Sequence, residues 1–484
     1  MQTSDVVVPS GALLINGDWI ADSSGGRVDQ VNPATGLPLG SFVLAGPEEV
    51  DAAVGAARAA AGEWRRWAPA DRRDVLLAVA RLLQEHDAEL GALRSLETGA
   101  PLKRRRGRSL AAEYFTYFAG WVDKIEGRTI PVGPDALDYT IAEPYGVVAV
   151  IIPWNGPVVS AGMKVAPALA AGNTVVLKPS ELGPMAALRF GELCQEAGLP
   201  PGVLNVVPGG QAAGAALVGH PDVGKVSFTG GIRTAQKILA AAAENVTPVL
   251  LELGGKSAAV IFADADLEGA VEMGVMTGVA NMAGQACVLP TRMLVEDSVY
   301  GEVEERAAAL AGSITVGDPF DPTSQMGPVI NLTALERILD VVDRAGSEGA
   351  GELLAGGKRL GGPLSDGYFV APTVFGSVDN ASSLAQDEIF GPVLSLIRFG
   401  SDEEAVALAN GTRYGLGAFV FTRDLSRAHR VADRLEAGWI GVNGFPPMPA
   451  NAPFGGVKRS GFGREGGAAG LEEFLRPKNV FVRL

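Results

Sequence analysis

The sequence predicts an α/β protein whose sheets are mostly parallel and carry helices on both faces. Short apolar segments such as GVVAVII at 146–152 lack polar alternation, which is typical of strands buried on both faces. Helical segments of about a dozen residues separate such strands along 146–250, as in βαβ units. A chain of 484 residues is too long for one core, so two or three domains are expected.

The order of the elements follows from the same patterns. The first part of the chain mixes turns with a long helical pattern at about 47–93, where apolar residues recur at helical spacing. Later helices are predicted at 164–172 and 185–200. Strands are predicted at 146–155, 173–181, 202–210, 225–231, 245–250, 257–266, 291–297, 391–399 and 437–444.

Two segments fit neither half of this pattern, RTIPVGPDALDYTIAEP at 128–144 and KNVFVRL at 478–484. Both are predicted to be exposed strands, and exposed strand edges usually find partners. We interpret them as parts of an interface between subunits. The alternative is that they pair within one subunit.

Composition excludes several classes of function. The net charge of −15 disfavours nucleic-acid binding, because an acidic surface repels phosphates. The basic run KRRRGR at 103–108 is interpreted as a solvated helix face or loop, with an oligomer or phosphate contact as the alternative. No apolar run approaches the roughly 20 residues that span a bilayer, and no membrane partner is expected. The N-terminus lacks the basic region of a secretory signal.

Cysteine and histidine are scarce. Two cysteines in such a chain make no disulfide framework, which predicts a reducing, cytoplasmic location. The three histidines, His86, His220 and His429, lie far apart, and none pairs with a cysteine at metal-ligand spacing. No metal site is expected.

The cysteines have different surroundings. Cys194 lies in the helical segment FGELCQEAGL and is most simply a small core residue. Cys287 lies in NMAGQACVLP, where the small residues Ala283, Gly284 and Ala286 leave room for another molecule to approach its sulfur. A nucleophilic thiol needs that access. From the local sequence, a catalytic and a structural role for Cys287 are equally supported.

Two polar residues follow buried strands. Glu252 stands between apolar residues and a Gly-Gly turn, where burial would raise its pKa and suit it to act as a general base. The alternative is a strand-end carboxylate bonded to glycine amides. Asn155 ends the segment IIPWN, where its amide could donate to an oxyanion. A plain Asn-Gly turn is the alternative there.

The motifs VVLKPSE at 175–181 and SFTGGIRTA at 227–235 suggest a nucleotide site. An acid placed like Glu181, just past a strand, can hold the ribose of NAD, and its charge would repel the extra phosphate of NADP. Backbone amides at a helix start after Gly230 can bind phosphate, although this is not the usual G-x-G-x-x-G pattern.

Taken together, IIPWN, LKPSE, FTGG, ELGGKS, GQAC, DEIFGPV, GWIGVNG and PFGGVKRSGFGRE resemble the NAD(P)-dependent aldehyde dehydrogenase superfamily in order and spacing over nearly the whole chain. The resemblance implies a Rossmann-like cofactor domain (1–121 and 145–252), an α/β catalytic domain (253–465) and a bridging β-arm (122–144 and 466–484). It also implies a homodimer or homotetramer, and NAD as cofactor with NADP as an alternative.

The resemblance also implies site residues. Cys287 matches the catalytic thiol, Glu252 the general base, Asn155 the oxyanion donor together with the Cys287 amide, and Lys178 a lysine that contacts the cofactor ribose. The expected cofactor contacts are Ile151, Pro153, Trp154, Lys178, Ser180, Glu181, Gly210, Gly214, Phe228, Gly230, Gly231, Leu253, Gly254, Glu388 and Phe390.

The sequence departs from the family at two places. Gly231 and Ala235 replace a serine and a glycine that many members carry in the phosphate turn, although the backbone amides remain available. On the substrate side, small or flexible residues replace bulky ones, which suggests a widened tunnel for a bulky, apolar or aromatic aldehyde. The expected substrate residues are Gly156, Ser160, Met163, Ala286, Val288, Met448 and Phe454.

Three functions are compatible with these motifs. The first is an aldehyde dehydrogenase that releases a free acid. The second is a CoA-acylating enzyme, which the intact Glu252 motif disfavours because that base would activate water. The third is a dinucleotide-binding protein without turnover, which the joint presence of Cys287, Glu252 and Asn155 disfavours.

Overall fold

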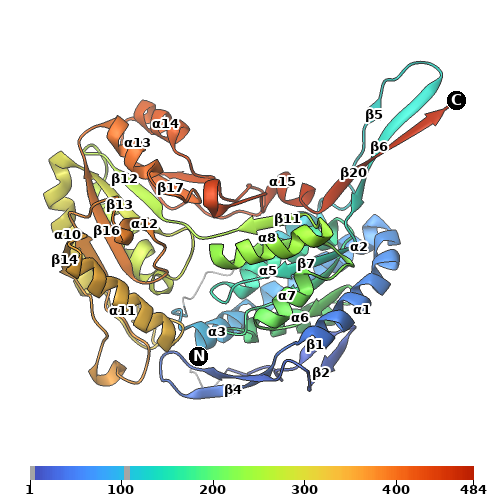
Figure 1. Cartoon of the computed structure of the whole chain (residues 1–484), viewed down its shortest axis with the longest axis horizontal. Coiled ribbons are helices and arrows are strands. Elements are labelled where there is room, and N and C mark those ends of the chain that lie inside the picture. Colours follow the sequence, from blue (N-terminus) through green and yellow to red (C-terminus); the bar gives the residue numbers. More distant parts are fainter. Residues whose placement is uncertain (1–5, 103–108) are drawn as a thin grey trace.

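The computed structural model describes residues 6–102 and 109–484, so the basic run at 103–108 and the first five residues lie outside the described residues. Two large sheets and a protruding three-stranded sheet organise this part of the chain. Figure 1 shows that the two large sheets lie side by side and that the small sheet extends away from them. No helix in the described ranges is long and apolar enough to cross a membrane.

The first sheet has eight strands in the order β19-β11-β10-β7-β8-β9-β1-β2, and its central strands run parallel. The predicted strands at 146–155, 173–181, 202–210, 225–231 and 245–250 are confirmed as members of this sheet. The bounds are β1 Leu13–Ile15, β2 Asp18–Ile20, β7 Val147–Ile151, β8 Thr174–Lys178, β9 Leu204–Val206, β10 Val223–Thr229, β11 Val249–Glu252 and β19 Gly461–Phe462.

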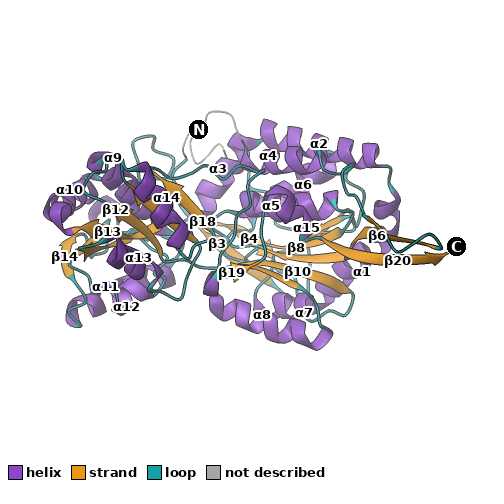
Figure 2. Cartoon of the chain, turned by 90° about the horizontal axis from the view of Figure 1, so that it is seen from above, coloured by secondary structure: helices purple, strands orange, loops and turns teal. Residues whose placement is uncertain are grey.

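Strand β7 shows why these segments are apolar throughout. Val148 and Val150 pack into the core under α2 to α6, while Val147, Ala149 and Ile151 pack into the core under α1, α7 and α8. Successive residues of a strand point to opposite faces, and here both faces are covered, as Figure 2 shows. The helices are α1 Pro47–Arg66, α2 Pro69–Glu85, α3 Asp87–Thr98, α4 Leu110–Ala119, α5 Pro157–Ala170, α6 Met185–Glu196, α7 Gln211–Val218 and α8 Ile232–Asn245.

The long helical pattern at 47–93 forms three helices rather than one. Pro69 begins α2, because proline lacks the N–H that a helix interior needs but fits its first turn. His86 lies between α2 and α3. The last of the three ends at Gly99, whose φ of 76° is the left-handed conformation that favours glycine.

The second large sheet has seven strands in the order β14-β15-β16-β13-β12-β17-β18, parallel except at β14. The predicted strands at 257–266, 291–297, 391–399 and 437–444 are confirmed within it. The bounds are β12 Ser257–Ile261, β13 Pro290–Glu296, β14 Glu352–Ala355, β15 Thr373–Gly376, β16 Val393–Phe399, β17 Gly417–Phe421, β18 Trp439–Val442, α9 Leu267–Glu272, α10 Tyr300–Ser313, α11 Leu332–Ser347, α12 Ser383–Gln386, α13 Asp402–Asn410 and α14 Leu425–Arg434.

The two segments predicted to be exposed strands pair with each other within one subunit. Strand β20 (Leu475–Arg483) lies antiparallel to β6 (Ala136–Pro144), which also pairs with β5 (Thr129–Ile130). The pairing alternative is therefore confirmed, although it does not exclude a subunit interface. A short helix, α15 (Gly467–Glu472), precedes this arm (Figure 1), and a separate hairpin of β3 (Arg27–Val31) and β4 (Pro38–Val43) lies near the N-terminus.

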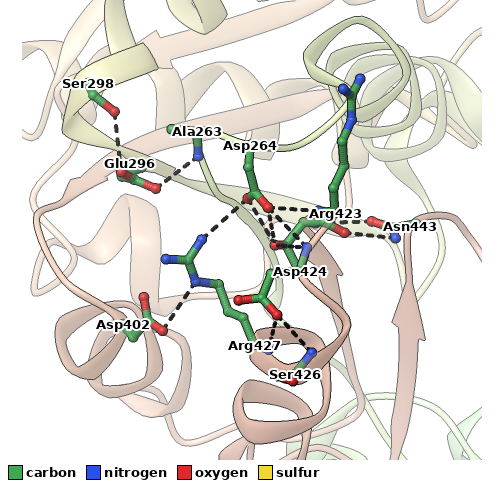
Figure 3. A network of polar contacts seen from close by, with 11 residues as sticks. Ala263, Asp264, Glu296, Ser298, Asp402, Arg423, Asp424, Ser426, Arg427 and Asn443 are labelled. Carbon is green, nitrogen blue, oxygen red and sulfur yellow. Dashed lines mark hydrogen bonds and ion pairs between the residues drawn. The ribbon is translucent and has the colours of Figure 1, made fainter.

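A network of hydrogen bonds and ion pairs around Asp264 lies at the carboxyl ends of strands β12 and β17 in the second sheet, as Figure 3 shows. The Asp264 carboxylate accepts hydrogen bonds from the Thr422 hydroxyl at 2.9 Å and from the N–H groups of Arg423 and Asp424 at 3.0 Å. Arg427 lies 3.3 Å from the same carboxylate. Burial raises the pKa of Asp264, but these bonds outweigh it and lower the pKa. The network joins the segments that follow β12 and β17.

The substitution Asp264→Asn is expected to lower the free energy of unfolding by about 1.5–3 kcal/mol at pH 7, because hydrogen bonds to a charged acceptor are lost. The difference from wild type should shrink as the pH falls through the lowered pKa of Asp264, where the wild-type carboxyl also becomes neutral. Urea unfolding measures both values. The exposed Ser298→Ala in the same region is the control, and an equal loss in both variants would contradict the assignment.

Candidate active site

The site lies where the two large sheets face each other. Strands β7, β8 and β10 of the first sheet end there, and the segments that lead into β13 and β16 of the second sheet begin there. A cavity of about 540 Å³ fills the space between them. Every residue predicted to contact the cofactor lines this cavity, together with Asn155 and Cys287. The arrangement agrees with the rule that open α/β sheets bind ligands beyond the carboxyl ends of their strands.

One part of the cavity is suited to a pyrophosphate. Gly231 is the N-cap of α8, and no side chain in the described structure caps the first backbone N–H groups. Such a helix start attracts anions through its dipole and its free donors. Gly230 has no room for a side chain, because a Cβ there would lie 2.4 Å from the ring of Phe228. Lys237 also lines this part of the cavity and adds a positive charge that the sequence analysis did not identify.

The end of β8 supplies groups suited to a ribose. The Lys178 ammonium donates to the carbonyl oxygen of Gly209 and to that of Pro179 at 3.3 Å. Burial lowers the pKa of Lys178 to about 8, although the nearby charge of Glu181 opposes this effect. Glu181 lines the same part of the cavity, where its carboxylate can accept hydrogen bonds from ribose hydroxyls.

Glu388 and Phe390 lie at the other end of the cavity. Glu388 accepts a hydrogen bond from the Gly255 N–H at 3.1 Å, and burial raises the pKa of its carboxyl to about 7. Its carboxylate lies so close to Gly254 that a Cβ there would be 2.0 Å from Oε2. The ring of Phe390 packs edge-on against that of Trp154, with 5.7 Å between the ring centroids. The apolar rings beside a carboxylate could hold the nicotinamide and its ribose.

Cys287 is half-buried at this same end, and it is a free thiol. Burial raises the pKa of the thiol to about 12, and the charges of Glu388 and Glu252 raise it further, whereas the backbone N–H of Cys287 opposes the increase. Asn155 lines the cavity with it and donates one amide N–H to the Gln285 carbonyl at 2.8 Å. No described residue accepts the second N–H of the Asn155 amide, which is left for another acceptor.

The raised pKa of Cys287 predicts a pH-dependent reactivity. In protein without cofactor, the rate at which iodoacetamide alkylates Cys287 should rise about tenfold per pH unit from pH 7 to pH 10, because only the thiolate reacts. Peptide mass spectrometry separates this reaction from that of Cys194, which is fully buried. A rate that already levels off by pH 8 would contradict the raised pKa.

Glu252 is buried behind the cavity rather than on its wall. It is 3% exposed, and neither carboxylate oxygen has a hydrogen-bond partner among the described residues. Burial raises its pKa well above the usual range, Glu465 adds to this, and Lys164 and Arg464 oppose it. The buried Lys164 pairs with Glu465 and donates to the Ser227 hydroxyl at 3.0 Å. A carboxyl whose pKa is raised in this way is a stronger base, when ionised, than an ordinary glutamate.

The residues expected to face the substrate, unlike those expected to contact the cofactor, lie outside the lining of the cavity. None of them is among the described residues that line the 540 Å³ cavity. Met163, Val288 and Phe454 are buried, and Phe454 contacts the ring of Trp439 at 5.8 Å. Gly156 has open space beside it, since a Cβ there would meet only the Ser160 hydroxyl at 3.9 Å. Ser160, Ala286 and Met448 are half-buried.

Several residues that shape this site were not predicted from the sequence. Lys164 and Glu465 surround Glu252, and a lysine within the apolar segment GMKVAPALAAG was a detectable signal, because lysine is rarely buried without a partner. Gln285 is buried two residues before Cys287. The motif GQAC that contains it was recognised, but Gln285 itself was not predicted to be a site residue. Arg337 on α11 donates to the carbonyl oxygens of Ile389 and Phe390, and no local pattern marked it.

Comparison with known proteins agrees with this geometry. The model of the aldehyde dehydrogenase family matches residues 19–480. An aldehyde dehydrogenase from Enchytraeus buchholzi is 43% identical over 99% of this chain and 97% of its own length. A betaine aldehyde dehydrogenase from Cereibacter sphaeroides is 42% identical over 98% of this chain and 97% of its own.

A solved structure extends the comparison to the cofactor. The betaine aldehyde dehydrogenase of Staphylococcus aureus in complex with NAD⁺ superposes with a TM-score of 0.95 and 38% identity, covering 98% of this chain and 95% of that one. A family match over nearly the whole length, relatives above 40% identity and a neighbour crystallised with NAD⁺ lead to one conclusion. The chain belongs to the aldehyde dehydrogenase family and is an NAD-dependent oxidoreductase that acts on aldehydes.

Proposed function

We propose that the enzyme oxidises a bulky, apolar or aromatic aldehyde to the free acid through a covalent intermediate on Cys287. The observation that carries the proposal is the position of Cys287, at the end of a cavity whose other walls suit a phosphate and a ribose. A helix N-terminus, a ribose-binding carboxylate and a ring-lined slot are the groups that a dinucleotide needs. When bound, NAD would supply the hydride acceptor and, on its nicotinamide ring, a positive charge that favours the Cys287 thiolate.

Each of the remaining steps of the reaction is assigned to residues of this chain. The Cys287 thiolate attacks the aldehyde carbon, and the free N–H of Asn155 and the N–H of Cys287 stabilise the oxyanion that forms. Loss of hydride from this adduct leaves a thioester on Cys287. Glu252 then accepts a proton from water, which attacks the thioester, releases the acid and restores the thiolate. Glu388 and Phe390 hold the reacting end of the cofactor in this scheme.

The substitution Asn155→Ala is expected to lower kcat by about 100-fold or more, because a single oxyanion donor contributes that much elsewhere. KM for NAD should change little, since the other cavity residues remain. Steady-state assay of NADH absorbance measures both constants. Near-normal turnover would contradict the role given to Asn155.

We assign residues 1–121 and 145–252 to the cofactor domain, 253–465 to the catalytic domain, and 122–144 and 466–484 to the arm. The first sheet and its helices support the first assignment, although β19 joins that sheet from the second segment. The arm exposes apolar side chains on its strands, including Ile130, Leu137 and Phe481. Exposed apolar strands favour association, so we infer a homodimer or homotetramer formed through the arm.

The substrate class rests on Gly156 and on three apolar residues of the expected substrate set. The open space beside Gly156, next to Asn155, and the apolar Met163, Val288 and Phe454 favour a large apolar group over a small or charged one. Betaine aldehyde dehydrogenases are among the relatives, so betaine aldehyde is the natural competitor. The free thiol of Cys287 needs a reducing environment, which supports a cytoplasmic location.

A panel of aldehydes tests the proposal. NADH formation should be fastest in kcat/KM with bulky aliphatic and aromatic aldehydes, slower with acetaldehyde and betaine aldehyde, and independent of added CoA. The substitution Gly156→Phe should selectively raise KM for the bulky aldehydes by filling the open space. Preference for acetaldehyde or betaine aldehyde would refute the substrate class. A requirement for CoA would refute release of a free acid.

A further inference from the structure

The segment before the nucleophile has an unusual backbone. Met282 and Ala283 have φ values of 53° and 51°, followed by Gly284 at 69°, so three consecutive residues adopt the left-handed conformation. Only glycine adopts it without strain, and two such side chains in a row need support from their surroundings. A Cβ on Gly284 would lie 2.0 Å from the Gly391 carbonyl oxygen, so this turn packs directly against the segment that carries Glu388 and Phe390.

The side chain of Gln285 provides that support. It is 2% exposed, and both ends of its amide are used. Its Nε2 donates to the Met282 carbonyl at 3.0 Å, and its Oε1 accepts from the Ile330 N–H at 3.0 Å. The first bond closes the left-handed turn, and the second anchors the turn to the segment just before α11. Ile330 is itself buried, so the anchor is fixed in the core.

The backbone of Gln285 also contacts the oxyanion donor. Its carbonyl accepts one N–H of Asn155 at 2.8 Å, which fixes the rotation of that amide and leaves the other N–H free. Two residues later the same chain carries Cys287 and its backbone N–H. The peptide at Gln285 therefore connects both oxyanion donors to one buried anchor.

We infer that Gln285 is a positioning residue, which fixes Asn155 and Cys287 relative to each other through its bonds to Met282 and Ile330. The inference rests on the proposed function, because it concerns the oxyanion donors of that reaction. Gln285 touches neither substrate nor cofactor in this account. It acts by holding the geometry that a reaction site needs to within a fraction of an ångström.

A double-mutant cycle tests the inference in the full-length enzyme. The variants are Gln285→Met, which keeps the side-chain length without its hydrogen bonds, Asn155→Ala, and the combination. Gln285→Met should lower kcat by about 10–100-fold, as loss of a supporting hydrogen bond does at other sites, with little change in KM for NAD. Because Gln285 acts through Asn155 as well as through the Cys287 N–H, Gln285→Met should slow Asn155→Ala by a smaller factor than it slows the wild type.

The control is Gln195→Met, which removes an exposed glutamine that bridges Trp19 and Gly17 and is not among the described residues that line the 540 Å³ cavity. It should keep wild-type kcat. Losses that multiply in the double variant, or a normal kcat in Gln285→Met, would overturn the inference. If Gln285→Met does not fold, Gln285→Asn serves instead, because it keeps an uncharged amide but is one methylene too short to make both the bond to Met282 and the bond from the Ile330 N–H.

A second measurement needs no aldehyde, so it separates this inference from the proposed function. The rate of iodoacetamide alkylation at Cys287, at fixed pH without cofactor, should fall in Gln285→Met, because the Cys287 N–H that lowers the pKa of its own thiol loses its fixed place. An unchanged rate would overturn the inference even in an active enzyme. Absence of NADH formation by wild type with every aldehyde would instead refute the proposed function.

Discussion

The substitution Cys287→Ala is expected to abolish aldehyde-dependent NADH formation, with kcat falling by roughly 10⁴-fold or more. The reason is that, among the described residues that line the cavity, Cys287 is the only thiol. Without the sulfur, the aldehyde cannot form the tetrahedral adduct from which hydride departs. Steady-state assay with a bulky aldehyde measures the loss.

A matched control comes from the other cysteine. Cys194 is buried in α6 and lines no part of this cavity, so Cys194→Ala should keep wild-type activity. The affinity of Cys287→Ala for NAD should remain close to that of the wild type, because the other cavity residues are unchanged. Quenching of tryptophan fluorescence measures this affinity. Full turnover in Cys287→Ala would refute covalent catalysis at this position.

The substitution Glu252→Gln is expected to stop the reaction after hydride transfer. One equivalent of NADH should form per active site in a rapid burst, and steady-state turnover should fall by about 10²–10⁴-fold, since the amide cannot take a proton from water. Rapid-mixing absorbance measures the burst and the later rate. Hydroxylamine, which cleaves thioesters without a base, should restore NADH formation in the variant.

The raised pKa of Glu252 adds a pH dependence to the same step. Because the carboxylate is the active form, the wild-type rate of acid release should increase as the pH rises toward the raised pKa of Glu252. The residual rate of Glu252→Gln should not show this increase. Loss of the burst itself in the variant would contradict the assignment, because it would place Glu252 before hydride transfer.

The first sheet and its cavity were predictable because their signals are local. Strands β7 and β8 read as unbroken apolar segments, since helices cover both of their faces. Asn155, Lys178 and Gly230 lie at or just after the ends of β7, β8 and β10, so their meeting at one edge of the sheet followed from parallel topology. The choice between a catalytic and a structural Cys287 needed the resemblance to a family, because its neighbours alone support both roles.

Long-range contacts could not be predicted in this way. Glu465 is 301 residues from Lys164 in sequence, and together they set the surroundings of Glu252. Strand β20 similarly pairs with β6 across most of the chain. The hydrogen bond between Gln285 and Ile330 depends on a left-handed turn that no sequence pattern predicts.

The central claim is that Cys287 carries the acyl group, and peptide mass spectrometry of Glu252→Gln tests it most directly. After one burst with NAD and a bulky aldehyde, the peptide containing Cys287 should gain the mass of the acyl group, at about one per active site. A Cys287 peptide of unmodified mass, after a full equivalent of NADH has formed, would contradict the account.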